Sequence, residues 1–592
     1  MTRLSRRDLL RVLGTTAAAG ATLGASPANR LLDTRSAVAH DAPAVVFARV
    51  GAPRTDAQAA VLASLDDTHR VLADGGIEVL LWPGDEARAR AAGLDVTVLD
   101  PDVLAAQRQT PGAAVGLQPG ERDDYRVWED FEADLRALVA ANPGRARLVT
   151  LPETSLLGYR IFGIEIATDV DAQDGRPVVH IDGMHHAREW PAAEMPIMWA
   201  HDLLESYGSD PRTTSIVDNA RTIIIPNCNP DGFIRSRESV AAFDSSNDPL
   251  GAAQLGLAVA GAESYWRKNL RNLSGVNANV DPIGTAGARY GNADAYGIDL
   301  NRNYGHLWGD NQGSSGSQTS QSYRGSAPYS EPEARNVRWS FLRSAPITAI
   351  THHTSGQIML YAWGRDPDRH RSRDWELMFD LGVKMQASNG YVPQQAFGLY
   401  PTSGTSRDWA HSVCSTIIYT FEHGTEFHGP YGRTVPEMYA RNRGAFLDHS
   451  EWAMDPRNHA TITGEVRVGG RPVAASVRLT KAARTPVTGG TVVDDPVDVP
   501  FRAGAEGRFD LRVPPSTRPF LEAAPPDLAD RANPKGNPYP GGLDPILQSH
   551  AQHYTAGKEP WTLVVEVPGR QPVTRQVVVD RGQAVDVGVI DV

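Results

Sequence analysis

Three things are scarce in this sequence: cysteine, basic charge and long apolar runs. Its 592 residues include only Cys228 and Cys414, so a disulfide framework is excluded, although two cysteines suffice for a single bridge. Acidic residues outnumber basic ones by 70 to 58, and the net charge of -12 argues against nucleic acids and anionic membranes as partners. Beyond the N-terminus no stretch indicates a membrane span. A hydrophobic content of 41% indicates an ordinary soluble globular protein.

The first 39 residues have the features of an export signal. A paired arginine lies within Ser5 to Arg11, a short and weakly apolar run follows from Val12 to Ala25, and Ala37 to Ala39 offers small residues for cleavage. This order resembles a twin-arginine signal, and the apolar run is too short to span a bilayer. We therefore expect residues 1–39 to be removed and the mature protein to be secreted.

The next part of the chain predicts a small α/β unit at residues 40–105. Its predicted strands are 44–50, 77–82 and 96–99, and its predicted helices are 56–72 and 84–92. Residues 106–122 are rich in Gln, Gly and Pro and predict a linker. A chain of 592 residues is too long for one core, and we expect two to four domains.

Residues 123–454 predict an α/β domain. Spacings of three and four between apolar residues predict an amphipathic helix at 123–141. The predicted strands are the apolar runs 159–167, 177–181, 222–226, 347–351 and 416–421. Several of these runs are rich in Val, Ile and Thr and lack polar alternation, which is typical of strands buried on both faces. We therefore predict a mixed, mostly parallel twisted sheet with helices on both faces.

The C-terminal residues 458–592 have a different pattern. Short strand-like segments are separated by Gly and Pro turns, and no long helical period is present. This pattern predicts a small β-sandwich.

The most informative stretch follows the predicted strand 177–181. The strand breaks at Gly183, and a helix is predicted from Pro191, so His186 and Glu189 lie on the loop between them. Imidazole and carboxylate are zinc ligands, and a catalytic zinc site needs a third protein ligand. Open α/β sheets build their sites beyond the carboxyl ends of strands. The predicted strand 347–351 runs on into His352 and His353, so we expect the third ligand there.

Six further stretches occur together with this motif. They are Asn227–Phe233, Trp266–Lys268, Asp299–Tyr304, His353–Gln357, the loop around Tyr400, and Tyr419–Glu422. Their order and content resemble the zinc carboxypeptidase family typified by the pancreatic A and B enzymes, over residues 123 to about 454. A secreted bacterial member of this family is expected. The resemblance implies one zinc ion per catalytic domain and hydrolysis of the C-terminal bond of peptides and proteins.

The resemblance also implies which histidines bind zinc. His186, Glu189 and His353 match the family's ligands. The neighbouring histidines, His185 and His352, are the alternatives. They are disfavoured because the family places its glutamate three residues after the first histidine and a glutamine, here Gln357, four after the second.

Further roles follow from the same resemblance. Glu422 matches the family's general base, which moves the proton of the attacking water to the leaving amine. Arg267 matches the residue that polarises the scissile carbonyl and stabilises the oxyanion. Asp299 is expected to orient His186 from behind. The alternative for Glu422 is a carboxylate in a buried ion pair.

Substrate binding is implied at four positions. Asn301 and Arg302 match the clamp for the terminal carboxylate, for which a guanidinium offers a two-bond fork. Tyr400 matches the tyrosine that closes over the C-terminal residue, with an ordinary loop aromatic as the alternative. Arg188 is expected to help bind the peptide.

Specificity is expected to depend on Arg407. It occupies the family's pocket-floor position, one residue before Asp408 and Trp409. An arginine there predicts release of C-terminal Glu or Asp. The alternative is that Arg407 turns to solvent or pairs with an acidic neighbour, and the sequence leaves both open.

The flanking domains resemble family accessories. Residues 40–105 resemble the propeptides that cover the cleft, and Arg108 and Arg122 are candidate cleavage positions in the linker. The C-terminal sandwich resembles the transthyretin-like domain of regulatory carboxypeptidases. We expect a monomer whose partners are peptide or protein C-termini. Two other hypotheses are a zinc peptidase acting on cell-wall peptides and a non-catalytic binding protein, although the latter conflicts with the complete set of catalytic residues.

Overall fold

The computed structural model describes residues 46–62, 65–72, 76–81, 84–101, 103, 120–237, 265–271, 273, 297–310, 313–318, 320–364, 372, 374–482, 496–516 and 558–592. The predicted signal 1–39, Arg108 and most of the linker lie outside them.

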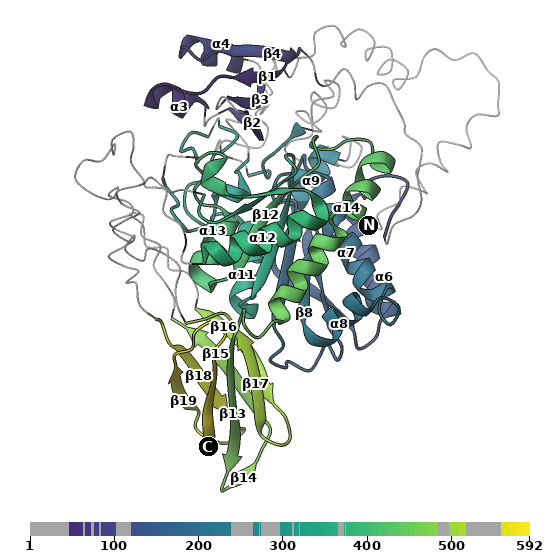
Figure 1. Ribbon diagram of the computed structural model, residues 1–592, viewed down its shortest axis with the longest axis vertical. Helices are drawn as coiled ribbons and strands as arrows, with labels where there is room; N and C mark the ends of the chain where they lie inside the picture. The colour runs from purple at the N-terminus through teal and green to yellow at the C-terminus, as the bar shows by residue number, and fades with distance from the viewer. Residues whose placement is uncertain are drawn as a thin grey trace, which may run out of the picture. The chain divides into compact units, whose positions relative to one another are not determined.

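The N-terminal α/β unit is an antiparallel four-stranded sheet in the order β2-β3-β1-β4 (Figure 1). Its elements are β1 Val46–Val50, α3 Asp56–Leu62, β2 Asp66–Val71, β3 Ile77–Leu81, α4 Asp85–Ala91 and β4 Val96–Asp100. The helix predicted for residues 56–72 was wrong beyond Leu62. Residues 66–71 include Asp, Thr, His and Val, all weak helix formers, and they pair with the edge of β3 instead.

The central domain contains an eight-stranded sheet in the order β11-β10-β12-β9-β7-β8-β6-β5. Its strands are β5 Ala146–Thr154, β6 Arg160–Ile166, β7 Val178–Gly183, β8 Arg221–Ile225, β9 Thr348–Thr354, β10 Ile358–Tyr361, β11 Val392–Gln395 and β12 Ile417–His423. The neighbours β12, β9, β7 and β8 run parallel. The carboxyl ends of β12, β9 and β7 therefore meet at one edge of the sheet.

Helices cover both faces of this sheet, as Figure 1 shows. They are α6 Trp128–Ala141, α7 Pro191–Glu205, α8 Pro211–Asn219, α9 Pro230–Arg237, α11 Pro332–Ser344, α12 Trp375–Asn389, α13 Ser406–Cys414 and α14 Tyr431–Met454, with a 3-10 turn η4 at Leu300–Arg302 and another, η5, at Ala396–Gly398. Helices α6, α7, α8, α12 and α14 share one apolar core, and α11 and α13 contribute to a second. The predicted fold class is confirmed.

Helix α6 begins five residues later than predicted. The backbone N–H and the guanidinium of Arg126 both bond the buried carboxylate of Glu194 on α7, so residues 123–127 stay outside the helix. None of the described helices is long and apolar enough to cross a membrane. Cys228 and Cys414 are both buried and form no disulfide with each other, and burial raises the pKa of the Cys228 thiol well above its usual value.

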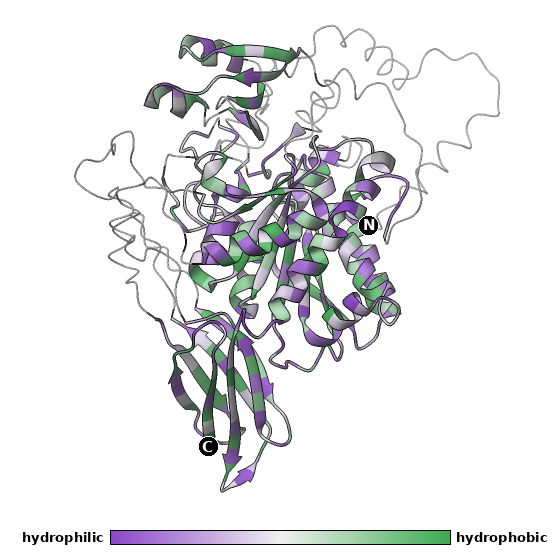
Figure 2. Ribbon diagram, in the orientation of Figure 1, coloured by the Kyte–Doolittle hydropathy of each residue, from purple (hydrophilic) through white to green (hydrophobic). Residues whose placement is uncertain are grey.

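The C-terminal region forms two four-stranded sheets, β14-β13-β17 with β20 beside β13, and β16-β15-β18-β19. Its strands are β13 Ala460–Val468, β14 Arg471–Pro472, β15 Ala475–Lys481, β16 Val497–Ala503, β17 Arg508–Val513, β18 Trp561–Glu566, β19 Val573–Val577 and β20 Ala584–Asp591. Buried and partly exposed residues alternate along β15 and β18, and Figure 2 shows hydrophilic and hydrophobic residues mixed along the strands of this region. The inner face shares one apolar core with α11 and α13, so the sandwich is packed directly on the central domain.

Candidate metal centre and active site

Strand β7 ends in a loop that leads directly into α7. A Cβ atom on Gly183 would lie only 2.0 Å from the carbonyl oxygen of Ala192, so a larger residue could not fit at this turn. Pro191 begins the helix, where its missing N–H costs no hydrogen bond. The loop in between therefore holds His186 and Glu189 at the carboxyl edge of the sheet.

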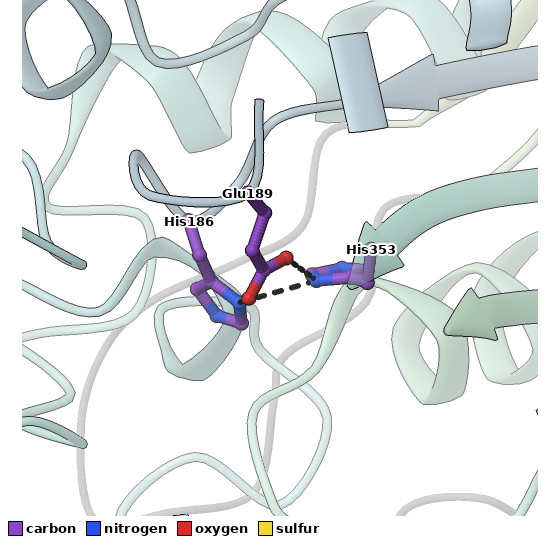
Figure 3. Close-up of side chains that lie close together, drawn as sticks. All are labelled: His186, Glu189 and His353. Atoms are coloured by element: carbon purple, nitrogen blue, oxygen red, sulfur yellow. Dashed lines mark hydrogen bonds and ion pairs between the residues drawn. The ribbon is translucent and has the colours of Figure 1, made fainter. Parts of the chain in front are cut away.

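His186, Glu189 and His353 converge at this edge (Figure 3). The Nδ1 atoms of the two histidines lie 3.1 Å apart, and they are 2.7 Å and 2.9 Å from the two oxygens of Glu189. All three residues are buried, and their donor atoms lie within 4.8 Å of one another. Two nitrogens and a carboxylate at this spacing form a donor set that suits zinc.

The protonation of these groups also suits a cation. Burial lowers the pKa of His353 to about 3, so its imidazole is neutral and keeps a lone pair for a metal. Burial alone would raise the pKa of Glu189, but His186 and His353 lower it well below its usual value. A buried carboxylate anion between two imidazoles is what a divalent cation would neutralise.

The two alternative histidines are directed elsewhere. The Nε2 atom of His185 lies 2.8 Å from the Tyr304 hydroxyl, and Nδ1 of His352 lies 2.7 Å from Nε2 of His423. Burial lowers the pKa of both imidazoles. The structure therefore uses His185 and His352 in buried networks and brings only their neighbours to the centre.

Asp299 supports the centre from behind. Its Oδ1 lies 3.2 Å from Nε2 of His186, and its Oδ2 accepts hydrogen bonds from Nε and Nη2 of Arg267 at 3.2 and 2.9 Å. Burial would raise the pKa of Asp299, but Arg267, Arg302 and His186 lower it well below its usual value. One buried carboxylate thus orients both a ligand histidine and the arginine expected to stabilise an oxyanion.

Most of the other predicted residues line one cavity beside the centre. Its lining is His186, Asn301, Arg302, Leu360, Ala396, Leu399, Tyr400, Thr402, Thr405, Arg407, Thr420 and Glu422. Glu422 pairs in register with His353 on the neighbouring strand, which explains why it reaches the same edge. Tyr400 is half-buried and packs against Leu360 and Leu399. Apolar walls and a charged floor give this cavity the character of a side-chain pocket.

Asn301 and Arg302 lie on the turn η4 at the edge of the cavity. Asn301 bonds Nε2 of His353 and the backbone N–H of Ser406 at 3.3 and 3.0 Å. Arg302 donates from Nε to the Gly313 carbonyl at 2.5 Å and from Nη1 to the Asn301 carbonyl at 2.9 Å. Among the described residues, no carboxylate pairs with Arg302 and no group accepts from its Nη2.

Arg407 is buried in the cavity floor rather than turned to solvent. Its Nε donates to Asp408 at 2.9 Å, and its two terminal nitrogens approach the hydroxyls of Thr420 and Thr402 at 3.4 and 3.3 Å. Arg407 thus has the acidic neighbour that the alternative hypothesis expected, and the preference for acidic C-terminal residues stays a prediction. The guanidinium has an acidic neighbour, but only one edge of it is engaged, and the other faces two weakly held hydroxyls.

Arg188 lies outside this cavity and has an unexpected partner. Its guanidinium forms a two-bond pair with Asp66 of the N-terminal unit, and both side chains are buried. It also lies 4.0 Å from the ring centroid of Phe427. Sequence reasoning missed Asp66, Thr402 and Thr420, because no motif marks them and each depends on contacts between distant segments.

The comparisons with known proteins agree with this geometry. Residues 131–442 match the family model described as zinc carboxypeptidase. The chain is 25% identical over 352 residues to carboxypeptidase A2 of Rattus norvegicus, covering 57% of this chain and 73% of that protein. It is 28% identical over 272 residues to carboxypeptidase O of Bos taurus, covering 44% and 60%.

A solved structure shares the fold. The crystal structure of carboxypeptidase A from Helicoverpa armigera aligns with a TM-score of 0.53 at 20% identity, over 70% of this chain and 98% of that one. The sheet and its donor set thus define an α/β protein with a candidate site for a catalytic metal ion. Since the family model spans more than half of the chain, the protein belongs to the zinc carboxypeptidase family, whose members are peptide hydrolases. The predicted family and its zinc cofactor are confirmed.

Proposed function

We propose that the protein is a secreted metallocarboxypeptidase that removes single residues from peptide C-termini. The observation that carries this proposal is the position of Arg302. Its guanidinium lines the same cavity as His186 and Glu422, and no described carboxylate forms an ion pair with it. A free α-carboxylate is the substrate feature that matches such a fork, and it exists only at a chain end.

The ligands His186, Glu189 and His353 would hold the zinc ion, which when bound supplies Lewis acidity and a water of lowered pKa. Glu422 accepts the proton of the attacking water at its carboxylate and returns it to the leaving amine. Arg267, fixed by Asp299, donates hydrogen bonds to the oxygen on which negative charge develops.

The same cavity favours an acidic C-terminal residue. A substrate Glu or Asp side chain would meet the outer edge of the Arg407 guanidinium and the hydroxyls of Thr402 and Thr420. Asp408 holds the inner edge, so Arg407 needs no reorganisation to receive a carboxylate. Each hydroxyl can donate to the incoming carboxylate as well, which completes a receptor for one anionic group.

The N-terminal unit is proposed to inhibit the enzyme as a propeptide. Asp66 occupies both terminal nitrogens of Arg188, which is expected to bind the peptide. Removal of the unit requires a cut in the chain between residues 101 and 128. Arg122 is an unsuitable position for this cut, because it pairs with Asp130 at 3.0 Å and its N–H bonds Tyr431. Arg108 therefore becomes the preferred candidate.

Export by the twin-arginine route is also part of the proposal and rests on residues 1–39 alone. It predicts that changing Arg6 and Arg7 to lysine retains the precursor inside the cell. Immunoblots of cells and medium would check this. Appearance of the mature protein in the medium of the lysine variant would contradict it.

The experiment for the activity compares peptides with a free and an amidated C-terminus. The full chain and a chain without residues 40–122 would be assayed on blocked dipeptides with Glu, Leu or Lys at the end, with zinc and with a chelator. We expect chelator-sensitive release from free acids only, and Arg302→Met should abolish this discrimination. Equal cleavage of acids and amides would refute the carboxypeptidase proposal, and release from cell-wall peptides alone would change the substrate class.

A further inference from the structure

Asn269 joins two segments that carry the catalytic residues. Its Oδ1 accepts from the backbone N–H of Ile298 at 2.8 Å and of Arg271 at 3.3 Å. Its own backbone N–H donates to the Ile298 carbonyl at 3.1 Å. Asn269 stands two residues after Arg267, and Ile298 stands one residue before Asp299. The side chain thus ties together the two ends of the Arg267–Asp299 ion pair.

The approach of these two segments is unusually close. A Cβ atom on Gly297 would lie 2.8 Å from the carbonyl oxygen of Asn269, and φ of Gly297 is +89°, so glycine is required there. On its other side, Arg267 accepts a hydrogen bond from the N–H of Ala187 in the metal-ligand loop at 2.9 Å. The backbone of Arg267 is therefore held between the ligand loop and the contact made by Asn269.

The amide group of Asn269 is anchored on helix α11. Its Nδ2 donates to Glu331 at 2.7 Å and approaches Glu333 at 3.4 Å, and all three residues are buried. Glu331 is further held by Arg271 at 3.0 Å. Among the described residues Asn269 is fully bonded at both side-chain atoms, so truncating it would strand buried partners.

We propose that Asn269 is a positioning residue for Arg267. It acts by fixing the segment 265–271 against residues 297–299 and against Glu331, so that the guanidinium is already aimed before substrate arrives. This inference rests on the proposed role of Arg267 in stabilising the oxyanion. Pre-organised donors stabilise a transition state because they do not move during the reaction.

The test is a double-mutant cycle. Each variant is expressed as the full chain and assayed after the N-terminal α/β unit has been released by proteolysis. Asn269→Ala should lower kcat by about tenfold to 100-fold with KM within about twofold, since small misplacements of a catalytic group cost up to about 100-fold. In an Arg267→Ala background the same substitution should cost less than about twofold, because the group that it positions is gone. Zinc content should stay at one per chain.

Asn336→Ala is the matched control. Asn336 is also a buried asparagine, on α11, and it bonds the backbone N–H and carbonyl of Glu153 at 3.0 and 2.8 Å. Its loss should lower the Tm without changing kcat. Hydrogen exchange of the zinc-free protein gives a readout besides activity. Exchange of segment 265–271 should rise in Asn269→Ala and stay unchanged in Asn336→Ala.

The outcomes separate this inference from the proposed function. If Arg267→Ala leaves kcat unchanged, the role of Arg267 in the proposed function fails. If Arg267→Ala lowers kcat but Asn269→Ala lowers kcat by the same factor with and without Arg267, the positioning role is overturned. It is also overturned if Asn269→Ala leaves the hydrogen exchange of segment 265–271 unchanged. Should Asn269→Ala not fold, Asn269→Ser, which keeps one hydroxyl for these partners, takes its place in the same cycle.

Discussion

Replacing Arg407 by leucine tests the acidic preference most directly. The guanidinium is buried, and its outer edge offers two terminal nitrogens to a substrate carboxylate. Hydrogen bonds to charged groups contribute about 1.5–3 kcal/mol each, and a buried charge left without its partner costs about 3–5 kcal/mol. Asp408 already neutralises part of the Arg407 charge, so we expect the loss of the guanidinium to cost about 2–3 kcal/mol of transition-state stabilisation for a substrate ending in Glu. This cost corresponds to a fall in kcat/KM of about 30- to 150-fold.

The assay is hydrolysis of blocked dipeptides ending in Glu, Gln or Leu. In Arg407→Leu the ratio of kcat/KM for Glu over Leu should fall by at least the amount above, since the remaining Asp408 carboxylate also repels the substrate. The double variant Arg407→Leu/Asp408→Asn removes this repulsion and should isolate the loss of the guanidinium. Arg343→Leu, an exposed arginine on α11, serves as the control and should change nothing.

The result that would refute the reasoning is an unchanged Glu-to-Leu ratio in both Arg407 variants with intact cleavage of the Leu substrate. If the Glu-to-Leu ratio fell in Arg407→Leu but matched the parent protein in the double variant, the fall would come from repulsion by Asp408 and not from loss of the Arg407 guanidinium. A fall in all three substrates together would indicate a folding defect, which the Tm of each variant distinguishes.

Three other predictions follow from buried charges. Asp66→Asn should weaken docking of the N-terminal unit on Arg188 by about 3–5 kcal/mol and raise the peptidase activity of the full chain, whereas the exposed Asp95→Asn should not; equal activity of the two would contradict inhibition through Asp66. Burial, with the carboxylates of Asp231 and Glu331, raises the pKa of Glu333, so this group lowers stability as the pH rises from about 4.3, the pKa of an unfolded Glu, toward its folded pKa. Between pH 5 and 8 the Tm of Glu333→Gln should therefore rise relative to the Tm of the parent protein, and a constant Tm difference would refute this. A chelator should lower the Tm of the parent protein, by an amount that corresponds to about 4 kcal/mol at 1,000-fold excess of zinc over its Kd, and should have no effect on His353→Ala.

The sequence was sufficient where function depends on the end of a strand. The apolar runs identified β7, β9 and β12, and parallel neighbours necessarily bring their carboxyl ends together. This is why the loop after residues 177–181 and the strand ending in His352 and His353 could be assigned to one site, whereas the choice of His353 and the role of Glu422 came from the family resemblance. Strands β5, β10 and β11 were missed, because their mixed or short sequences carry no clear period.

The sequence was insufficient where a contact joins segments with independent patterns. Nothing in residues 66–71 marks Asp66 as the partner of Arg188, 122 residues away, and the helical prediction for this stretch even placed it on the wrong element. Asn269 is equally unmarked, since its role depends on Ile298 and Glu331. Such contacts are set by the way domains and loops pack, which local propensity does not encode.

The pairing of the arginines explains how the site can select a chain end. Arg267 pairs with Asp299, Arg407 with Asp408, and Arg188 with Asp66, so three buried cations have buried counter-ions. Among the described residues, Arg302 donates hydrogen bonds only to carbonyl groups, and Asp299, which it influences electrostatically, is already bonded to Arg267. A buried guanidinium without a carboxylate bonded to it favours an anion, because water does not screen it there. Under the proposed function, the terminal carboxylate of a substrate is therefore expected to bind Arg302, and Arg188 is expected to contact the rest of the peptide only when Asp66 withdraws.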